Sequence, residues 1–236
     1  MLASASPRRR ELLGQICRGF RILPSAIDEA PPPGSPADVV VALALAKARA
    51  VAGGVPDAVV LGADTLVVVD GAILGKPRAA AEAVGMLRRL RNRRHEVLTG
   101  VAVVHARARG ERTAVVRTQV TMRDYSDAEI EAYVGTGEPL DAAGAYAVQA
   151  GGGRLVAAVE GCYTNVVGLP LTTHARTPPV VRRQRAPPGV STCRSGSRRS
   201  IWATRVPCRT FGRGTCSRII AIVASRAGGS TRPCGR

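Results

Sequence analysis

An apolar run that ends in a turn signal limits the folds open to this 236-residue chain. Valine and leucine dominate residues 59–69, and Asp70 and Gly71 then separate this run from Ile73 and Leu74. An Asp-Gly pair between two apolar segments is a strong signal for a β-hairpin. We therefore predict a hairpin over residues 59–76.

Two charged residues mark the ends of this hairpin. Asp64 comes just before the apolar residues 66–69, and Lys76 stands immediately before Pro77. A carboxylate and an ammonium that meet in a cleft would suit the hydrolysis of a phosphate ester by a metal-bound or base-activated water. An ordinary hairpin with a solvated Asp and Lys is the simpler interpretation of this stretch by itself.

The charge of the chain changes abruptly at about residue 172. Residues 1–172 carry 20 Lys and Arg against 17 Asp and Glu, whereas residues 173–236 carry 14 Arg, no Lys and no acidic residue. The tail thus accounts for +14 of the net charge of +17. We expect a folded domain over 1–172 and an Arg-rich tail over 173–236 that is disordered or translated out of frame.

The alternative interpretation of this tail is an arm that binds nucleic acid or a division-related partner, with the domain before it a degraded enzyme. Its arginines would bind phosphates in a salt-dependent way. Trp202 and Phe211 are its only aromatic residues, and it contains no known nucleic-acid-binding module. Nucleic acid is therefore the less favoured partner.

Nothing in the sequence suggests secretion or a membrane span. Residues 1–10 lack an apolar segment after their positive charges, and no apolar run approaches about 18 residues. Within residues 1–172 the only cysteines, Cys17 and Cys162, are too few and too far apart for a disulfide framework. We expect a cytoplasmic protein that does not interact with membranes.

Helix and strand signals alternate along residues 1–172. Cap and spacing signals, with Ser35 as an N-cap and Ser126 to Glu129 as a capping box, predict helices that begin near residues 8, 36, 78 and 127. Strands are expected at 20–27, 59–69, 96–105, 113–122, 147–149 and 155–159. This order predicts a single α/β domain, and its hairpins favour a mixed sheet.

Three smaller features could belong to a site. Ser6 and residues Arg8 to Arg10 fall at a predicted helix N-terminus, where backbone N–H groups and guanidinium groups can hold an anion; a solvated basic turn explains them equally well. Lys47 interrupts an apolar helix surface, a position from which lysine usually extends to solvent. His95 lacks a second His four residues on, so we expect it to be structural.

Five sequence blocks, in order, resemble the Maf family of nucleoside triphosphate pyrophosphatases. The resemblance covers residues 2–171. Its blocks are LASASPRR at 2–9 followed by two leucines, Asp28-Glu29, the helix with Lys47-Ala48, GADT at 62–65 with GKP at 75–77, and GEPLDAAGAYAVQ at 137–149 with NVVGLP at 165–170.

The resemblance implies a twisted sheet flanked by helices, with a central cleft, and an enzyme that cuts a nucleoside triphosphate between its α and β phosphates with a divalent metal, Mg²⁺ or Mn²⁺. Members often form homodimers. The implied catalytic residues are Asp64 as the base with Lys47 and Lys76 as cations. Ser6, Arg8 and Arg9 would hold phosphates, and Glu29 would place the metal with Asp64.

Three residues bear on the base that is bound. The branch of the family that prefers dTTP and UTP carries the equivalents of Arg8, Thr65 and Gln149, and a neutral Gln can both donate to and accept from a pyrimidine edge. In one departure, this chain has Ala142 where the family commonly has Lys. We therefore assign no catalytic lysine to that loop.

Overall fold

The computed structural model describes residues 1–27 and 29–171. The predicted tail over 173–236, and with it the proposed nucleic-acid-binding arm, lies outside the described residues. No helix of the described residues is both long and apolar enough to cross a bilayer.

The elements alternate as the sequence predicts for an α/β domain. The helices are α1 (Pro7–Ile16), α2 (Pro36–Ala52), α3 (Ala80–Leu90), α4 (Asp127–Val134) and α5 (Tyr163–Val167), with short 3-10 helices η1 (Glu138–Asp141), η2 (Ala143–Ala145) and η3 (Gly151–Leu155). The strands are β1 (Val59–Val69), β2 (Ala72–Leu74), β3 (Arg94–His105), β4 (Gly110–Met122) and β5 (Val156–Glu160).

Five strands form one sheet in the order β2-β1-β3-β4-β5. The predicted hairpin is present: Val69 pairs with Ala72 across the Asp70-Gly71 turn. All pairs between these strands are antiparallel, and the parallel component that we expected is limited to bridges from Leu2 to Ile22 and to Leu61. The α/β domain is therefore confirmed, with an almost wholly antiparallel sheet.

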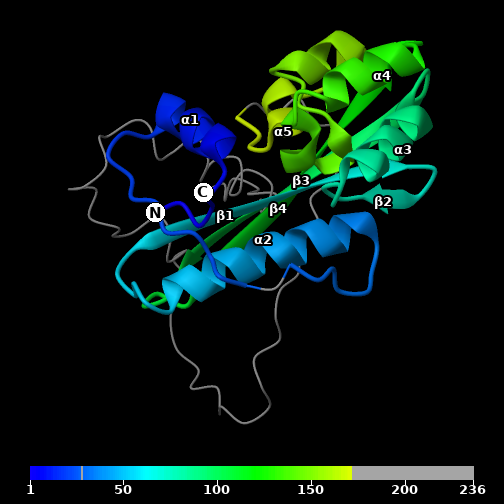
Figure 1. Ribbon diagram of the computed structural model, residues 1–236. Coiled ribbons are helices and arrows are strands. Elements are labelled where there is room, and N and C mark those ends of the chain that lie inside the picture. The colour runs from blue at the N-terminus through cyan, green and yellow to red at the C-terminus, as the bar shows by residue number, and fades with distance from the viewer. Residues whose placement is uncertain (28, 172–236) are drawn as a thin grey trace, which may run out of the picture.

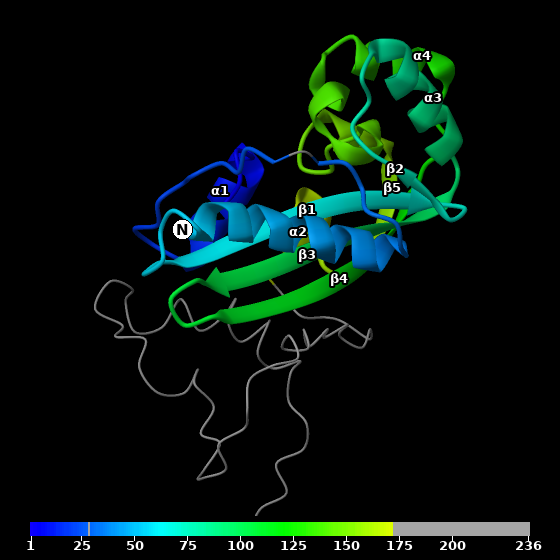
Figure 2. The same ribbon diagram turned by 90° about the horizontal axis from the view of Figure 1, so that it is seen from below.

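Helices cover both faces of the sheet (Figures 1 and 2). Along β1, Val60 packs toward α2, whereas Leu61 packs with α1 on the other face. This alternation puts Asp64 on the α2 face and Thr65 on the α1 face. Two neighbouring residues of one strand thus lie on opposite faces of the sheet.

A second group of elements stands at one end of the sheet, where α3 and α4 lie together (Figure 1). Their buried side chains, among them Leu87 and Ile130, form one apolar cluster with Val67 and Val97 of the sheet. The segments η1 and η2 pack against α3 in this group. The end of β1 thus connects the sheet to the region that carries residues 138–155.

Two predicted strands are wrong. In 20–27 only Ile22 makes a bridge, because Pro24 has no N–H to donate and Leu23 remains exposed. Residues 147–149 end in a turn at Val148 and Gln149. The glycines that follow fold there into η3 instead of extending a strand.

Candidate active site

A cleft of about 640 Å³ opens between α1, the Lys47 segment of α2, β1 and residues 141–149. Every site residue that the family resemblance implies lines it: Ser6, Arg8, Arg9, Glu29, Lys47, Asp64, Thr65, Lys76 and Gln149. These residues come from six separate segments of the chain. The fold therefore brings together the whole predicted set.

The floor of the cleft contains a buried ion pair. Lys47 Nζ lies 2.6 Å from Asp64 Oδ1 and 2.8 Å from Glu29 Oε1. Lys47 is 5% exposed and Asp64 is 7% exposed, whereas the Glu29 side chain is 62% exposed. A lysine on an apolar helix usually extends to solvent, but here a carboxylate on the facing strand gives the Lys47 ammonium a buried partner.

Glycine makes this pairing sterically possible. A Cβ at Gly62 would lie 2.3 Å from the carbonyl oxygen of Ala44, so only glycine lets the α2 backbone approach β1 this closely. Ala44 and Lys47 are three residues apart and share one face of α2. Gly62 and Asp64 are two apart and share one face of β1. The close approach therefore sets Lys47 directly over Asp64.

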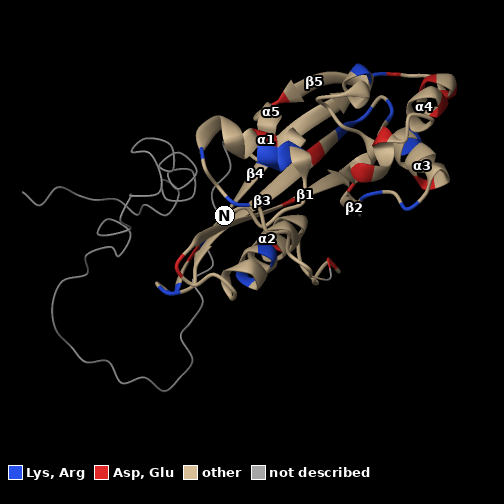
Figure 3. Cartoon of the chain, turned by 60° about the vertical axis from the view of Figure 1, so that its left-hand side comes forward, with Lys and Arg blue, Asp and Glu red and all other residues tan. Residues whose placement is uncertain are grey.

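The N-terminus of α1 forms a basic wall (Figure 3). Ser6 caps the helix by accepting a hydrogen bond from the Arg9 backbone N–H. No acidic residue stands in the first turn, so Arg8 and Arg9 oppose the helix dipole. Burial lowers the pKa of Arg9, while Asp64 and Glu29 favour its charged form.

Arg9 is held by three acceptors. Its Nε donates to the Gly168 carbonyl oxygen (2.9 Å), its Nη1 to Ser4 Oγ (3.4 Å) and its Nη2 to Thr65 Oγ1 (3.1 Å). Thr65 in turn forms a hydrogen bond with Thr99. The protein's own acceptors therefore orient the guanidinium.

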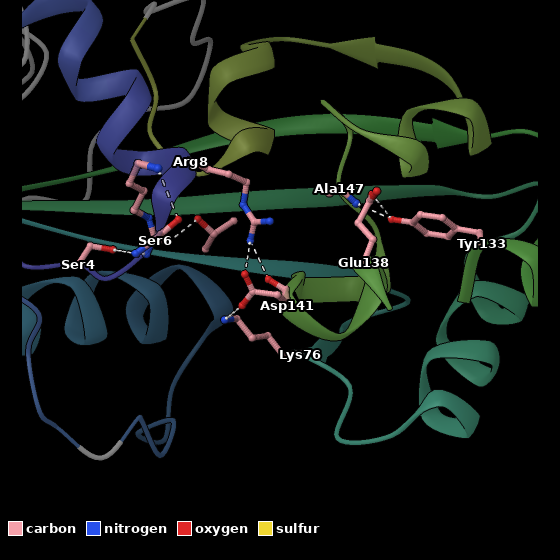
Figure 4. Close-up of polar contacts among 10 residues, drawn as sticks. Ser4, Ser6, Arg8, Lys76, Tyr133, Glu138, Asp141 and Ala147 are labelled. Atoms are coloured by element: carbon pink, nitrogen blue, oxygen red, sulfur yellow. Dashed lines mark hydrogen bonds and ion pairs between the residues drawn. The ribbon is translucent and has the colours of Figure 1, made fainter. Parts of the chain in front are cut away.

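Asp141 links two cations of the cleft, the exposed Lys76 and the partly buried Arg8, as Figure 4 shows. Lys76 Nζ donates to Asp141 Oδ1 (2.5 Å), and Arg8 Nη2 donates to the Asp141 main-chain oxygen (2.7 Å). The hydrogen bond from Lys76 holds the pKa of the Asp141 carboxyl below its usual value. Sequence reasoning assigned Asp141 no role, because its partners are far away in the sequence.

Glu138 organises the segment that carries Gln149. Its carboxylate accepts hydrogen bonds from Tyr133 Oη (2.7 Å) and from the backbone N–H groups of Gly151 (3.0 Å) and Gly152 (3.2 Å). Figure 4 shows Tyr133 and Glu138 beside Ala147, whose N–H donates to Tyr133 Oη. Burial opposes ionisation of Glu138, but these hydrogen bonds outweigh it and lower the pKa.

His95 is structural, as predicted. It is 3% exposed, and its Nε2 lies 2.7 Å from Tyr146 Oη. Tyr146 lines the cleft, so the histidine supports the wall from behind. Burial lowers the pKa of His95 to about 4.

The donors available to a metal are the two carboxylates that converge on Lys47. The described residues contain no group of three or more His, Cys, Asp and Glu that could hold a metal ion. Mg²⁺ commonly binds through one or two carboxylates together with substrate phosphates and water. Glu29 and Asp64 fit a metal of that kind, because phosphate oxygens would complete the donor set.

A buried carboxylate that is paired with a lysine and lies beside several further cations defines a class of site that binds and cleaves a polyphosphate. The model of the Maf-like protein family matches residues 1–177. The chain belongs to the Maf family.

The chain is also similar to enzymes that carry the name dTTP/UTP pyrophosphatase. The one from Moorella thermoacetica is 59% identical over 176 residues, which is 72% of this chain and 89% of the relative. The one from Pelotomaculum thermopropionicum is 52% identical over 172 residues, 72% of this chain and 90% of the relative. The one from Myxococcus xanthus is 54% identical over 172 residues, 72% of this chain and 86% of the relative.

Proposed function

We propose that this protein hydrolyses nucleoside triphosphates, with dTTP and UTP as preferred substrates, to the monophosphate and pyrophosphate. The buried Lys47–Asp64 pair at the bottom of a cleft lined by arginines carries the proposal. The names of the similar proteins support both the reaction and the substrates.

Asp64 is the proposed general base. Its Oδ1 is engaged by Lys47, which fixes the plane of the carboxylate, and within the described residues Oδ2 is not engaged. That second oxygen would accept a proton from the attacking water. Lys47 therefore acts as an orienting cation beneath the base.

The arginines and Lys76 would bind the negative charge of the triphosphate. Arg9 has an orientation fixed by its three acceptors. Arg8 and Lys76 now share Asp141, and phosphate oxygens would compete with that carboxylate for both cations. Preorganised cations stabilise the charge that develops on the leaving pyrophosphate.

A divalent cation, Mg²⁺ or Mn²⁺, is part of this proposal. Glu29 and Asp64 would hold it, and when bound it would neutralise phosphate charge and favour attack by water. Gln149, at the exposed turn before η3, would meet the base with one donor and one acceptor. The proposal also places the enzyme in the cytoplasm, as a homodimer. Size-exclusion chromatography would test the dimer.

The test is pyrophosphate release from a panel of triphosphates with Mg²⁺ or Mn²⁺. We expect dTTP and UTP to be cleaved fastest and Asp64→Asn to abolish the reaction. Asp70→Asn is the matched control: Asp70 is exposed, pairs with Arg93 and has a positive φ that asparagine tolerates. Release of orthophosphate, or full activity of Asp64→Asn, would contradict the proposal.

A further inference from the structure

The hydrogen bonds of Arg9 leave part of its guanidinium available to a ligand. A guanidinium carries five N–H donors, and the acceptors at Gly168, Ser4 and Thr65 engage three of them within the described residues. Arg9 borders the cleft. The direction in which the other two donors point is therefore set by the three acceptors.

The acceptor at Thr65 belongs to a chain with a single direction. The Asn165 main-chain oxygen can only accept, so Thr99 Oγ1 donates its one proton to it (2.9 Å). In the contact between Thr65 Oγ1 and Thr99 Oγ1 (3.0 Å), Thr99 must then accept and Thr65 must donate. The Thr65 oxygen is left with lone pairs for Arg9.

The far end of this chain is fixed to the sheet. Thr65 and Thr99 are direct partners in the β1–β3 register. Thr99 and Asn165 are fully buried, and the Asn165 side chain donates to the Val97 oxygen (3.0 Å) and to Thr118 Oγ1 (3.1 Å). Hydrogen bonds in such a low-dielectric environment reinforce one another.

We infer that Thr99 is a positioning residue for phosphate binding, which acts through Thr65 to aim the Arg9 guanidinium into the cleft. Thr99 is not among the residues that line the cleft, so it acts without touching the nucleotide. This inference rests on the proposed function. It also gives Thr65 a role on the phosphate side, where the sequence suggested a role in base preference.

Thr99→Val tests the inference, because valine keeps the shape of threonine and removes the acceptor of the Thr65 proton. We expect KM for dTTP to rise about tenfold, equivalent to about 1.4 kcal/mol, with a smaller change in kcat. The inhibition constant of inorganic tripolyphosphate should rise by the same factor, because the contact that is weakened is the one between Arg9 and phosphate. Thr99→Ser, which keeps the hydroxyl, should restore both values.

Thr118→Val is the matched control. Thr118 is 1% exposed on β4 and accepts from the Asn165 side chain, whereas Thr99 donates to the Asn165 main-chain oxygen, so Thr118→Val leaves each hydrogen bond from Thr99 to Arg9 in place. The same chemical change there should alter the melting temperature and leave KM unchanged. Equal KM shifts in Thr99→Val and Thr118→Val, or no recovery in Thr99→Ser, would overturn the inference.

A second substitution covers the case in which Thr99→Val does not fold. Thr65→Val lies at the cleft wall, where it is only partly buried, and should weaken tripolyphosphate binding by the same factor. Unchanged tripolyphosphate affinity in Thr65→Val would also overturn the inference. Isothermal titration calorimetry measures this tripolyphosphate affinity without turnover. A failure of the inference can therefore be told apart from a failure of the proposed pyrophosphatase activity.

Discussion

His95 should make the stability of this protein depend on pH. Its pKa is lowered from 6.5 to about 4 by burial, so below pH 6.5 the unfolded chain binds a proton that the folded protein does not. The contribution to stability is complete above pH 6.5 and is lost as the pH falls toward 4. From these two pKa values the loss is about 2 kcal/mol at pH 5 and about 3 kcal/mol once the pH is below 4.

Urea unfolding between pH 8 and pH 5 measures this loss directly. His95→Gln cannot titrate, so its free energy of unfolding should change by less than about 0.5 kcal/mol over that range, whatever the constant cost of losing the ring. His105→Gln, at the other end of β3, is the control for removing a histidine from this strand. Carboxylates with ordinary pKa values titrate mainly below pH 5, so they contribute little to the loss of stability between pH 8 and pH 5. If wild type and His95→Gln lost the same free energy of unfolding over this range, the reasoning would be refuted.

Three further predictions concern the cleft and its supports. Lys47→Met should lower the free energy of unfolding in urea by about 3–5 kcal/mol, because it leaves Asp64 buried without its cation; a loss below about 1 kcal/mol would contradict the buried pair. Gly62→Ala should lower the free energy of unfolding by at least about 1–3 kcal/mol and reduce activity, because its Cβ would meet a carbonyl oxygen of α2. Gly85→Ala is the control: it has open space in α3 and should be neutral or stabilising by up to about 1 kcal/mol. Glu138→Gln should speed amide hydrogen exchange at the two glycine N–H groups that it binds, and protection equal to wild type would count against that tether.

Local signals in the sequence predict the framework of the fold well. Ser35 and Ser126 cap α2 and α4 as expected, and the Ser126–Glu129 capping box forms. The Asp70-Gly71 turn also pairs the strands as predicted. These features succeed because each depends on residues within a few positions of one another.

The environment of the site residues could not be predicted in the same way. The burial of Lys47 depends on the approach of α2 to β1, and the role of Asp141 depends on Arg8, 133 positions away. The tendency of lysine on an apolar helix surface to extend to solvent does not take into account a carboxylate on a facing strand. Only the resemblance to a family pointed to Lys47 as a site residue, and nothing in the sequence pointed to Asp141 or Thr99.

The hydrogen bond from Arg9 to the Gly168 oxygen joins residues 159 positions apart. Contacts between such distant residues close large loops and tend to form after local hairpins. During synthesis, α1 and strands β1 to β4 leave the ribosome long before residue 168 is available to hold the arginine. A partly made chain would therefore lack an oriented Arg9, and nucleotide cleavage would begin only when the last segments of the domain dock.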